Sequence, residues 1–502
     1  MAKICVPVCV RRIDELKAAT QQAAGLGDVV ELRLDYLEDP QAALAIVREL
    51  IDQGGIDLIL TLRAPDQGGV GSHTHDARHS FWMRAKELPK VLFDVEFEFV
   101  NRSPDLTIDF NRVICSHHDF TSVPAGLNQL YEAMAASSAK VIKIAAQAAD
   151  AVDCLPIFQL LDRARAEGRQ LIAIAMSPAG IMTRVLGPAR GSFLTYGSID
   201  DDSGTAPGQL TTRDLRELYR IDQVDSQTKI FGIIGKPVGH SLSPRIQNAA
   251  FAAAGINAVY LPIEVQDAIA FMRRMAHPKT RELDWNLRGL SVTAPHKATV
   301  MQFLDWIDRT AKEIGAVNTI VAEDGSLLGY NTDAEGFVSP LRTKLGDLRD
   351  ARCAVMGSGG AARAVLWALR KEGAEATLVA RNRERANDLA QRFKAACPPQ
   401  RPEKLSGFDV VINATTMGTR GPTADETPAT AEQLRGVRLA YDLVYNPSET
   451  RFLREAREAS CDTLGGIEML LAQAVEQFKL WTGIEPDRDV MRVAALNALV
   501  DK

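Results

Sequence analysis

A chain of 502 residues is longer than one hydrophobic core usually organises, so it predicts two or three domains. Its composition, 46% hydrophobic and 24% charged residues, is that of an ordinary soluble globular protein. The net charge of −6, without any basic run or stripe, excludes nucleic acid as an expected partner. Small anionic substrates remain compatible with it, because individual arginines could hold them.

The apolar runs and the N-terminus carry no membrane or export signal. No apolar run reaches the roughly 18 residues that a membrane helix needs. Residues 1–10, MAKICVPVCV, begin a strand at once and lack the features of a signal or transit peptide. The seven cysteines are scattered without a CxxC pair, which favours a reducing compartment over disulfides or zinc. We therefore expect a cytoplasmic protein with no membrane partner.

The first half alternates short strand-like runs with helix-like stretches. The runs lie at 4–10, 28–35, 58–63, 91–99, 112–119, 140–146, 170–177 and 193–198. Eight such units predict an α/β fold, a (β/α)8 barrel over residues 1–222, with a doubly wound sheet as the second choice.

Several of these strands carry polar residues where a packed barrel should be apolar. Glu31, Arg33 and Asp35 alternate along one run and so point to the same face. The carboxyl ends of barrel strands converge on one face, where further polar residues should meet them. These are Arg63, His118, Asp119, Lys143, Arg184 and Gln209.

Lys143 lies in the middle of VIKIAA, with apolar residues on both sides. A lone lysine in a strand is usually an edge or solvated residue, but barrel strands are covered on both faces and an unpaired buried ammonium is costly. A lysine in such a pocket can act as an amine nucleophile toward carbonyls, with His118 as the natural proton carrier. The residues thus predict a Schiff-base barrel for a small carbonyl acid, and both aldolase and dehydratase stay open. Glu31 and Arg33 also fit a purely structural ion pair.

Six motifs resemble type I 3-dehydroquinate dehydratase over nearly the whole first half. They are ELRLD (31–35), TLR followed by QGG (61–69), SHHDF (116–120), KIA (143–145), TR (183–184) and TAPGQ (205–209). The resemblance implies that Lys143 forms an imine with the substrate ketone and that His118 is the general acid/base. It implies further residues that hold the carboxylate and hydroxyls: Glu31, Arg33, Arg63, Arg184, Thr205 and Gln209. Gln67 stands where most members have glutamate, so it can hydrogen-bond but brings no negative charge near His118.

The stretch HTHDARH supplies His73, His75 and His79 as candidate metal ligands. It follows GGVGS, and its polarity favours a mobile loop over the barrel mouth. Because no matching ligand set accompanies these histidines, we predict no metal site.

A polar connector at 223–228 leads into the second half. Strand-like runs near 230–235, 258–264, 287–293 and 318–323 predict a substrate-binding α/β domain over 229–335, completed by about 467–502. Between these parts, residues 336–466 alternate strands and helices as a Rossmann-like unit does.

A glycine turn, GSGGAA at 357–362, follows the first strand of this unit. Its glycines let backbone amides approach a pyrophosphate at a helix N-terminus, although an ordinary strand–helix turn has the same appearance. The next strand ends in VARNRERA, where an NAD enzyme usually carries Asp or Glu. Arg381 and Arg385 offer guanidinium groups to a 2′-phosphate instead, which favours NADP, while solvated helix-start arginines are the alternative.

The catalytic candidates of the second half precede the glycine turn. Ser241 and Ser243 could together grip a carboxylate, or cap a helix before Pro244. Lys297 follows a strand, and Asp333 lies at the hinge into the nucleotide unit. If Lys297 and Asp333 lie on opposite sides of a cleft, they would deliver a proton to a carbonyl that receives hydride.

The second half resembles shikimate dehydrogenase. The motifs are GKPVGHSLSP, SVTAPHK, GAVNT, GYNTD, GSGGAAR, NATTMG, YDLVYNP and GGIEMLLAQAVEQFKLWTG. By this likeness Lys297 and Asp333 are the catalytic pair. The substrate would be surrounded by Ser241, Ser243, Thr293, Asn318, Tyr445 and Gln473. NADP would be lined by Gly357, Ser358, Gly359, Gly360, Ala361, Arg381, Asn382, Arg385, Thr415, Leu443, Gly466 and Met469. Ala380 stands where the family often has asparagine.

The two resemblances fit together, because the product of the first reaction is the substrate of the second. They imply a bifunctional enzyme that dehydrates 3-dehydroquinate to 3-dehydroshikimate and reduces this to shikimate with NADPH. The partners would be these small molecules alone, and no oligomeric state is predicted. One alternative is an NAD-linked quinate/shikimate dehydrogenase in the second half, against which Arg381 and Arg385 argue. The other is a non-catalytic sensor on the same folds, against which the four catalytic candidates argue.

Overall fold

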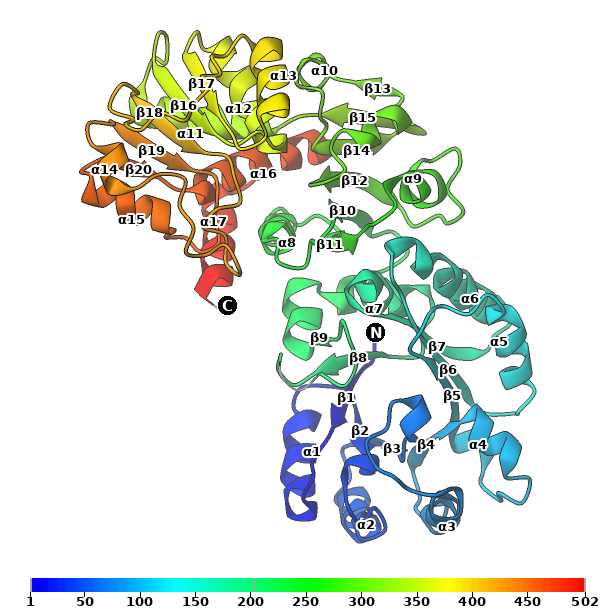
Figure 1. Ribbon diagram of the computed structural model, residues 1–502. Helices are drawn as coiled ribbons and strands as arrows, with labels where there is room; N and C mark the ends of the chain where they lie inside the picture. The colour runs from blue at the N-terminus through cyan, green and yellow to red at the C-terminus, as the bar shows by residue number, and fades with distance from the viewer. Residues whose placement is uncertain (1, 202–203, 501–502) are drawn as a thin grey trace.

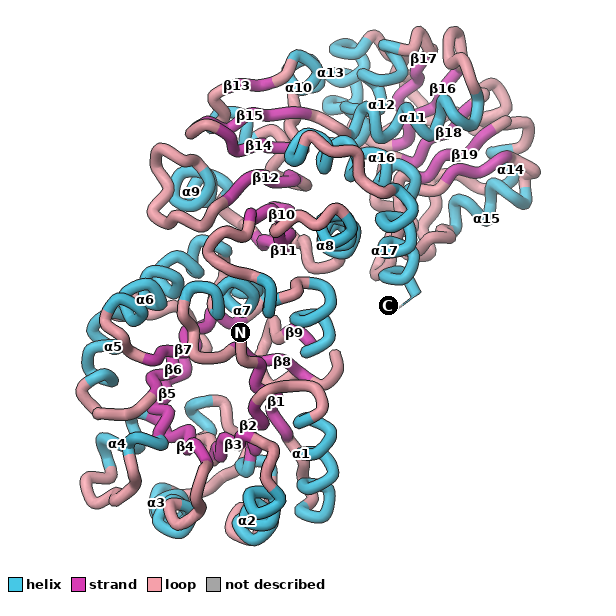
Figure 2. The backbone as a smooth tube through the Cα atoms, turned by 180° about the vertical axis from the view of Figure 1, so that it is seen from behind, coloured by secondary structure: helices cyan, strands magenta, loops and turns pink. Residues whose placement is uncertain are grey.

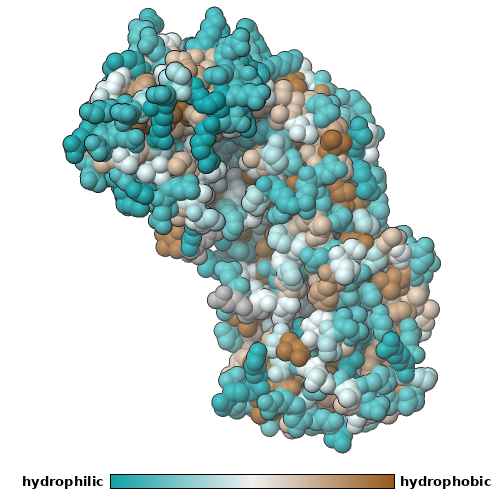
Figure 3. All heavy atoms as spheres, in the orientation of Figure 1, coloured by the Kyte–Doolittle hydropathy of each residue, from teal (hydrophilic) through white to brown (hydrophobic). Residues whose placement is uncertain are grey.

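The computed structural model describes residues 2–201 and 204–500. Figure 1 shows the first half as a ring of strands and helices and the second half as two further α/β layers above it. Surface residues in the view of Figure 3 are mostly hydrophilic, with apolar residues scattered among them. No helix among the described residues is long and apolar enough to cross a membrane.

The first half is a curled, all-parallel sheet ordered β7-β6-β5-β4-β3-β2-β1-β8-β9. Its strands are β1 (Ile4–Val8), β2 (Val29–Arg33), β3 (Asp57–Thr61), β4 (Val91–Glu96), β5 (Val113–Asp119), β6 (Val141–Gln147), β7 (Gln170–Met176), β8 (Thr195–Ser198) and β9 (Leu210–Thr211). A parallel bridge between Leu171 and Ser192 joins β7 to the residues before β8. The (β/α)8 prediction is confirmed, and all eight predicted runs contain a strand.

Helices cover the outside of this ring, as right-handed β-α-β crossovers require. They are α1 (Leu16–Ala24), α2 (Ala43–Gln53), α3 (His75–Ala85), α4 (Phe97–Arg102), α5 (Leu127–Ala135), α6 (Cys154–Ala166) and α7 (Ile181–Leu186). The 3-10 turn η6 (Pro178–Gly180) leads into α7. After β9 the chain forms a π-helical turn, Asp214–Leu218, and the 3-10 turn Ile221–Gln223.

The second half contains two sheets. The first has the order β11-β10-β12-β14-β15-β13, with β10 (Lys229–Gly235), β11 (Ala258–Glu264), β12 (Leu287–Val292), β13 (Trp306–Ile307), β14 (Thr319–Glu323) and β15 (Ser326–Tyr330). The second is all parallel, ordered β17-β16-β18-β19-β20, with β16 (Arg352–Met356), β17 (Glu375–Val379), β18 (Val410–Asn413), β19 (Leu439–Asp442) and β20 (Asp462–Leu464). Its parallel strands with intervening helices confirm the Rossmann-like prediction.

The helices of the second half connect and flank these sheets. They are α8 (Ser243–Ala253), α9 (Ala268–Phe271), α10 (Arg309–Ile314), α11 (Asp333–Leu345), α12 (Gly360–Lys371), α13 (Arg383–Phe393), α14 (Ala431–Leu434), α15 (Arg451–Glu458), α16 (Gly466–Thr482) and α17 (Arg488–Val500). The last two return to the first sheet, where α17 packs on α8 and Phe478 joins a buried cluster with Phe231 and Phe251. Figure 2 shows α16 running from the Rossmann-like sheet toward β12 and β14.

Candidate functional sites

The interior of the barrel is layered, and the layers differ in polarity. A lower layer is apolar and includes Cys5, Val29, Ile59, Ile114, Val141, Ile172 and Leu194. Side chains two residues apart along a strand lie on the same face. The next layer, two residues further along the strands, contains Glu31, Thr61, Asp94, Ser116, Lys143, Ile174 and Tyr196. Apolar packing therefore closes the barrel below and leaves a polar layer at its carboxyl end.

Lys143 is at the centre of the polar layer and is 5% exposed. Its Nζ donates to Oδ2 of Asp94 at 2.8 Å and to the hydroxyl of Tyr196 at 2.8 Å. Oε1 of Glu31 lies 3.8 Å away and accepts from Thr61 Oγ1 at 2.7 Å. The amine is thus fixed from several sides in a pocket that largely excludes water.

Asp94 is a buried carboxylate shared by two cations. Arg63 lies 2.8 Å from the same Oδ2 atom that Lys143 contacts, and Ser116 donates to Oδ1 at 2.6 Å. Burial alone would raise the pKa of Asp94, but Arg63 and Lys143 outweigh burial and hold this pKa well below its usual range. Asp94, Ser116 and Tyr196 were missed in the sequence, although their position two residues beyond an apolar inward residue could have identified them.

His118, at the end of β5, faces the same cavity. Its pKa is well below the usual value, first because the ring is buried and then because Arg63 and Lys143 are nearby cations. The ring is therefore neutral near pH 7 and can accept a proton. Nδ1 is buried without a hydrogen-bond partner among the described residues. Gln67 accepts from the backbone amide of His118 at 2.8 Å and so fixes the strand, not the imidazole ring.

Arg184 and the segment after β8 complete the cavity. Arg184 is 2% exposed, forms no ion pair with a described residue, and has its pKa lowered to about 10 by burial. Gln209 Oε1 accepts from Thr205 Oγ1 at 3.0 Å, while Gln209 Nε2 is buried without a described partner. Unused donors of this kind suit an anionic, oxygen-rich ligand. The eight predicted residues line one cavity of about 540 Å³: Glu31, Arg33, Arg63, His118, Lys143, Arg184, Thr205 and Gln209.

Arg33 has a different partner from the one considered in the sequence. It forms an ion pair with Asp35, with Nη2 and Oδ2 at 2.8 Å, and donates to the Gly68 carbonyl at 3.2 Å. Asp35 in turn accepts from the Val70 amide at 3.2 Å. The pair therefore fixes the loop after β3 over the cavity.

The predicted loop at HTHDARH is wrong for two of its three histidines. His75 and His79 lie on α3, because Thr74 caps this helix by accepting from the Ala77 amide at 3.3 Å. Nε2 of His75 lies 3.1 Å from the Ser103 hydroxyl, and Nε2 of His79 lies 3.3 Å from Oδ1 of Asp105. The described part of the chain contains no group of three or more side chains of His, Cys, Asp or Glu suited to a metal.

In the second half, Lys297 and Asp333 form an ion pair. Asp333 is the first residue of α11, where the helix N-terminus favours a negative charge. Its Oδ1 atom accepts from Asn318 Nδ2 at 2.8 Å, so the carboxylate is held from two sides. A Cβ atom on Gly360 would lie 3.9 Å from Cδ of Lys297, so the pair faces the glycine turn of the Rossmann-like sheet.

A buried chain of hydrogen bonds connects two of the predicted substrate residues, Ser243 and Asn318. Tyr260, which bonds Ser243, donates to Ser291 at 2.7 Å, and Ser291 donates to Gln477 at 2.9 Å. Gln477 then donates to Thr319 at 3.2 Å, and Thr319 donates to Asn318 at 2.8 Å. This chain joins Ser243 on α8 to Asn318 beside Asp333, and no local pattern of residues predicted it.

The remaining predicted substrate residues flank these groups. Ser241 Oγ accepts from the Ser243 amide at 3.2 Å, so the helix-start alternative describes part of its role. It also bonds Tyr445, whose pKa burial raises. Gln473 packs against Gly336 on α11, where an added Cβ atom would approach its Cβ to 2.6 Å. Thr293 packs against Gly235 in the same way, at 2.3 Å from Cγ2.

The glycine turn has the geometry of a nucleotide cradle. Gly357 has φ 111°, and a Cβ atom there would meet Thr415 at 2.8 Å. Gly359 faces open space, and α12 begins at Gly360 with its amides toward that space. Gly466 lies close to the Leu443 carbonyl, at 2.6 Å from an added Cβ atom. These contacts bring Gly357 next to Thr415 and Gly466 next to Leu443. The other predicted cofactor residues of these segments are Ser358, Gly359, Gly360, Ala361 and Met469.

Asp442 holds the loops of this cradle together. It is fully buried and accepts from Asn413 Nδ2 and the Val444 amide, both at 2.9 Å, and from Thr450. Asn413 accepts from Thr415 Oγ1 at 2.6 Å. Because no cation offsets the burial, the pKa of Asp442 is raised to about 6. The sequence analysis did not identify this residue.

Arg381 and Arg385 are exposed and form no ion pair with a described residue. Asn382 caps α13 by accepting from the Arg385 amide at 3.0 Å. Arg363 on α12 is close by, and its pKa is lowered by burial and then by Arg392 and Arg385. The surface at the end of β17 is therefore positively charged and available to an anion.

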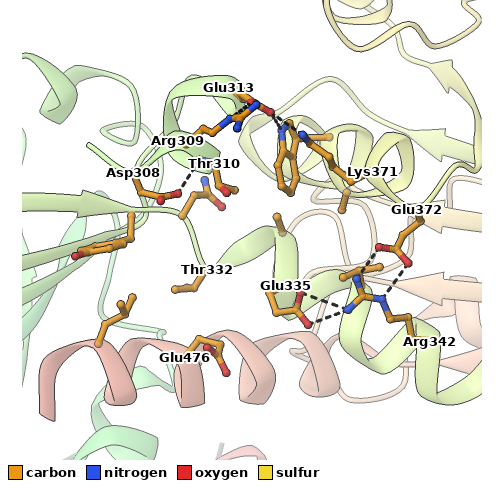
Figure 4. A pocket seen from close by; sticks show the side chains of 17 residues that line it. Asp308, Arg309, Thr310, Glu313, Thr332, Glu335, Arg342, Lys371, Glu372 and Glu476 are labelled. Carbon is orange, nitrogen blue, oxygen red and sulfur yellow. Dashed lines mark hydrogen bonds and ion pairs between the residues drawn. The ribbon is translucent and has the colours of Figure 1, made fainter. Parts of the chain in front are cut away.

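A large cavity of about 1240 Å³ contains none of the predicted site residues. It lies among α10, α11, α12 and α16, and its charges pair with one another, as Figure 4 shows. Arg342 binds Glu335 and Glu372, and Lys371 binds Glu313 at 3.1 Å. These pairs link α10 and α11 to the end of α12.

Comparison with known proteins assigns both halves. The family model for type I 3-dehydroquinase matches residues 4–226. The models for the shikimate dehydrogenase substrate binding domain, shikimate / quinate 5-dehydrogenase and the shikimate 5′-dehydrogenase C-terminal domain match 233–320, 340–443 and 466–496. A shikimate dehydrogenase (NADP(+)) of Methanosarcina acetivorans is 41% identical over 54% of this chain and 99% of its own. A crystal structure of shikimate dehydrogenase in complex with NADP+ is 36% identical, covers 55% of this chain and 97% of its own, and has a TM-score of 0.51.

The fold and the two sites define a class of protein, a lyase barrel joined to a nucleotide-dependent oxidoreductase. The bifunctional 3-dehydroquinate dehydratase/shikimate dehydrogenase of Arabidopsis thaliana is 33% identical over 97% of this chain and 83% of its own length. The chain belongs to the family of bifunctional 3-dehydroquinate dehydratase/shikimate dehydrogenases.

Proposed function

We propose that the chain catalyses two consecutive reactions, dehydration of 3-dehydroquinate to 3-dehydroshikimate and reduction of this product to shikimate with NADPH. The observation that carries the proposal is the convergence of eight predicted side chains on one cavity around a buried lysine. We assign the dehydratase to residues 1–222, the substrate domain to 229–335 and about 467–502, and the NADP domain to 336–466.

In the barrel, the amine of Lys143 attacks the substrate ketone, and loss of water gives an imine. The imine withdraws electrons, so the neutral ring of His118 can remove the proton on the adjacent carbon. The protonated ring then gives that proton to the departing hydroxyl group, which leaves as water. Hydrolysis of the imine releases 3-dehydroshikimate and restores Lys143. Arg184 is buried without an ion-pair partner among the described residues and is suited to the substrate carboxylate.

In the second half, NADPH supplies the hydride that the ketone receives. Lys297 provides the proton at the ketone oxygen, and Asp333 orients its ammonium group. Ser241, Ser243 and Tyr445 hold the carboxylate end, while Asn318 and Asp333 hold the hydroxyls.

The cofactor fits the residues present. The amides at the start of α12 would take the pyrophosphate, with Gly359 leaving space for it. Arg381 and Arg385 would take the 2′-phosphate, because both are exposed and unpaired with described residues. This arrangement argues against an NAD-linked quinate dehydrogenase. The intact Lys143–His118 and Lys297–Asp333 sets argue against a sensor without activity.

The direct test is NADPH oxidation on adding 3-dehydroquinate to the purified chain alone. We expect oxidation without any added enzyme, since the first site supplies the substrate of the second. The Lys143→Ala chain should lose this response but still oxidise NADPH with 3-dehydroshikimate. Borohydride added with 3-dehydroquinate should label Lys143, because hydride traps an imine as a stable amine. Labelling at another lysine would contradict the barrel assignment.

A further inference from the structure

The barrel covers the edge of a sheet that belongs to the dehydrogenase half. β11 is the edge strand of its sheet, and β10 is its strand neighbour. Both η6 and α7 of the barrel pack against β11, and Figures 1 and 2 show α7 directly beneath it. Arg220, just before the connector, donates to the Ala258 carbonyl at 3.0 Å. Since exposed edges are avoided, this contact is an integral part of the fold.

A second contact follows the end of β11. Asp150, in the loop after β6, accepts from the backbone amides of Gln266 and Asp267 at 2.6 and 2.9 Å. The side chain of Gln266 donates back to the Ala149 carbonyl at 2.5 Å. The other oxygen of Asp150 accepts from the Val152 amide at 3.0 Å. One carboxylate thus joins the start of the α6 segment to the dehydrogenase half.

Both contacts are connected to residues that line the dehydratase cavity. Arg184 lies on α7, the helix that packs beneath β11. Beside Ala149, the Ala148 carbonyl accepts from Ser177 Oγ at 2.6 Å. The Ser177 amide donates to the Pro207 carbonyl at 2.9 Å, and an added Cβ atom on Gly208 would approach the Ser177 carbonyl to 2.1 Å. Residues 205–209, which carry Thr205 and Gln209, therefore rest on Ser177, and Ser177 is bonded to the loop that Gln266 holds.

We propose that the dehydrogenase half is a positioning element of the dehydratase site. Strand β11 and residues 265–267 hold α7 and residues 148–150, and through them Arg184 and the segment 205–209. Asp94 and Tyr196 hold Lys143, and Gln67 holds the backbone of His118, so neither depends directly on these contacts. The coupling therefore acts on substrate binding more than on the chemical step. The proposal rests on the proposed function for its kinetic readout.

The test uses two full-length variants, Asp150→Ala and Gln266→Ala. We expect each to raise the dehydratase KM for 3-dehydroquinate about three- to ten-fold, a modest coupling between sites, and to leave kcat nearly unchanged. The shikimate dehydrogenase parameters should stay the same, since neither residue belongs to that site. Hydrogen exchange in α7 should be faster in both variants.

The matched control is Asp109→Ala, which also removes a carboxylate that accepts a turn amide, from Asn111 at 3.0 Å, but has no contact with the second half. Unchanged dehydratase KM with unchanged exchange in α7 would overturn the proposal, and so would an equal loss of both activities or the same effect in the control. If the wild-type chain acts on neither substrate, the proposed function fails, and the exchange in α7 alone decides the coupling.

Discussion

Nζ of Lys143 lies 2.8 Å from Oδ2 of Asp94, and both side chains are buried. A buried amine next to a carboxylate that also binds Arg63 is held in one position before substrate arrives. Asp94 therefore balances the charges of Arg63 and Lys143 at a position from which water is largely excluded.

Asp94→Asn should destabilise the barrel by about 3–5 kcal/mol, because it removes the closest carboxylate of both Arg63 and Lys143. Of their ion pairs with described residues, only the longer contacts to Glu96 and Glu31, at 3.7 and 3.8 Å, would then remain. Dehydratase activity should fall with the stability. The measurement is urea unfolding followed through the barrel transition. Glu132→Gln is the control, since it removes an exposed ion pair with Arg163 and should cost at most about 1 kcal/mol. Similar losses in both variants would contradict this account of Asp94.

Lys297→Met should cut dehydrogenase turnover far more than substrate affinity. Methionine keeps most of the bulk of the side chain but supplies no proton, and a positioned acid contributes about 10²–10⁴-fold. Asp333→Asn should harm both turnover and affinity, since Asp333 also meets Asn318 in the substrate region. Steady-state kinetics of both reactions would test this, with dehydratase activity unchanged in each variant. Near-normal turnover in Lys297→Met would mean that Lys297 only clamps the substrate.

Removal of Arg381 or Arg385 should weaken NADPH binding about ten-fold or more. A charge-assisted hydrogen bond contributes about 1.5–3 kcal/mol, and 1.4 kcal/mol is a factor of ten. NADH lacks the 2′-phosphate and serves as the internal control, so its affinity should stay the same. Binding can be followed by nucleotide fluorescence titration. Equal losses for both nucleotides would refute a phosphate contact.

Asp442 should make the Rossmann-like domain less stable as the pH rises. Its pKa is about 6 in the folded chain and about 3.9 when unfolded. A raised pKa favours the protonated folded form, so this contribution is complete below pH 4 and is lost as the pH rises through 6. A difference of about two pKa units between the folded and unfolded chain makes this loss about 2–3 kcal/mol. Asp442→Asn should flatten this part of the pH profile in thermal unfolding, and an unchanged profile would disprove the assignment.

Local patterns predicted most of the strands, because alternation and apolar runs are properties of neighbouring residues. They also identified Lys143 and His118, since polar residues inside barrel strands are unusual. The β14–β15 hairpin was missed even though Asp324 and Gly325, with φ of 49° and 74°, form the Asp-Gly turn that typically connects such strands.

What the sequence could not reveal depends on contacts between distant segments. Asp94 becomes important only because β3 and β6 bring Arg63 and Lys143 to it. The same holds for Tyr260 and Gln477, which link Ser243 to Asn318. Gln477 lies 159 positions beyond Asn318 and reaches it only because α16 returns to the first sheet. The polar stretch around the three histidines wrongly predicted a loop for two of them. Thr74 caps a helix there, and His75 and His79 belong to this helix.

A cut between the two halves of the chain would uncover the edge strand β11. Asn248 satisfies the amide and carbonyl of Tyr260 at the middle of this strand, but Arg220 and the barrel cover its start and flank. Proteolysis within 223–228, followed by separation of the fragments, would expose an apolar edge strand to any other chain in solution. The released dehydrogenase fragment should therefore self-associate, whereas a cut chain whose pieces stay docked should remain monodisperse.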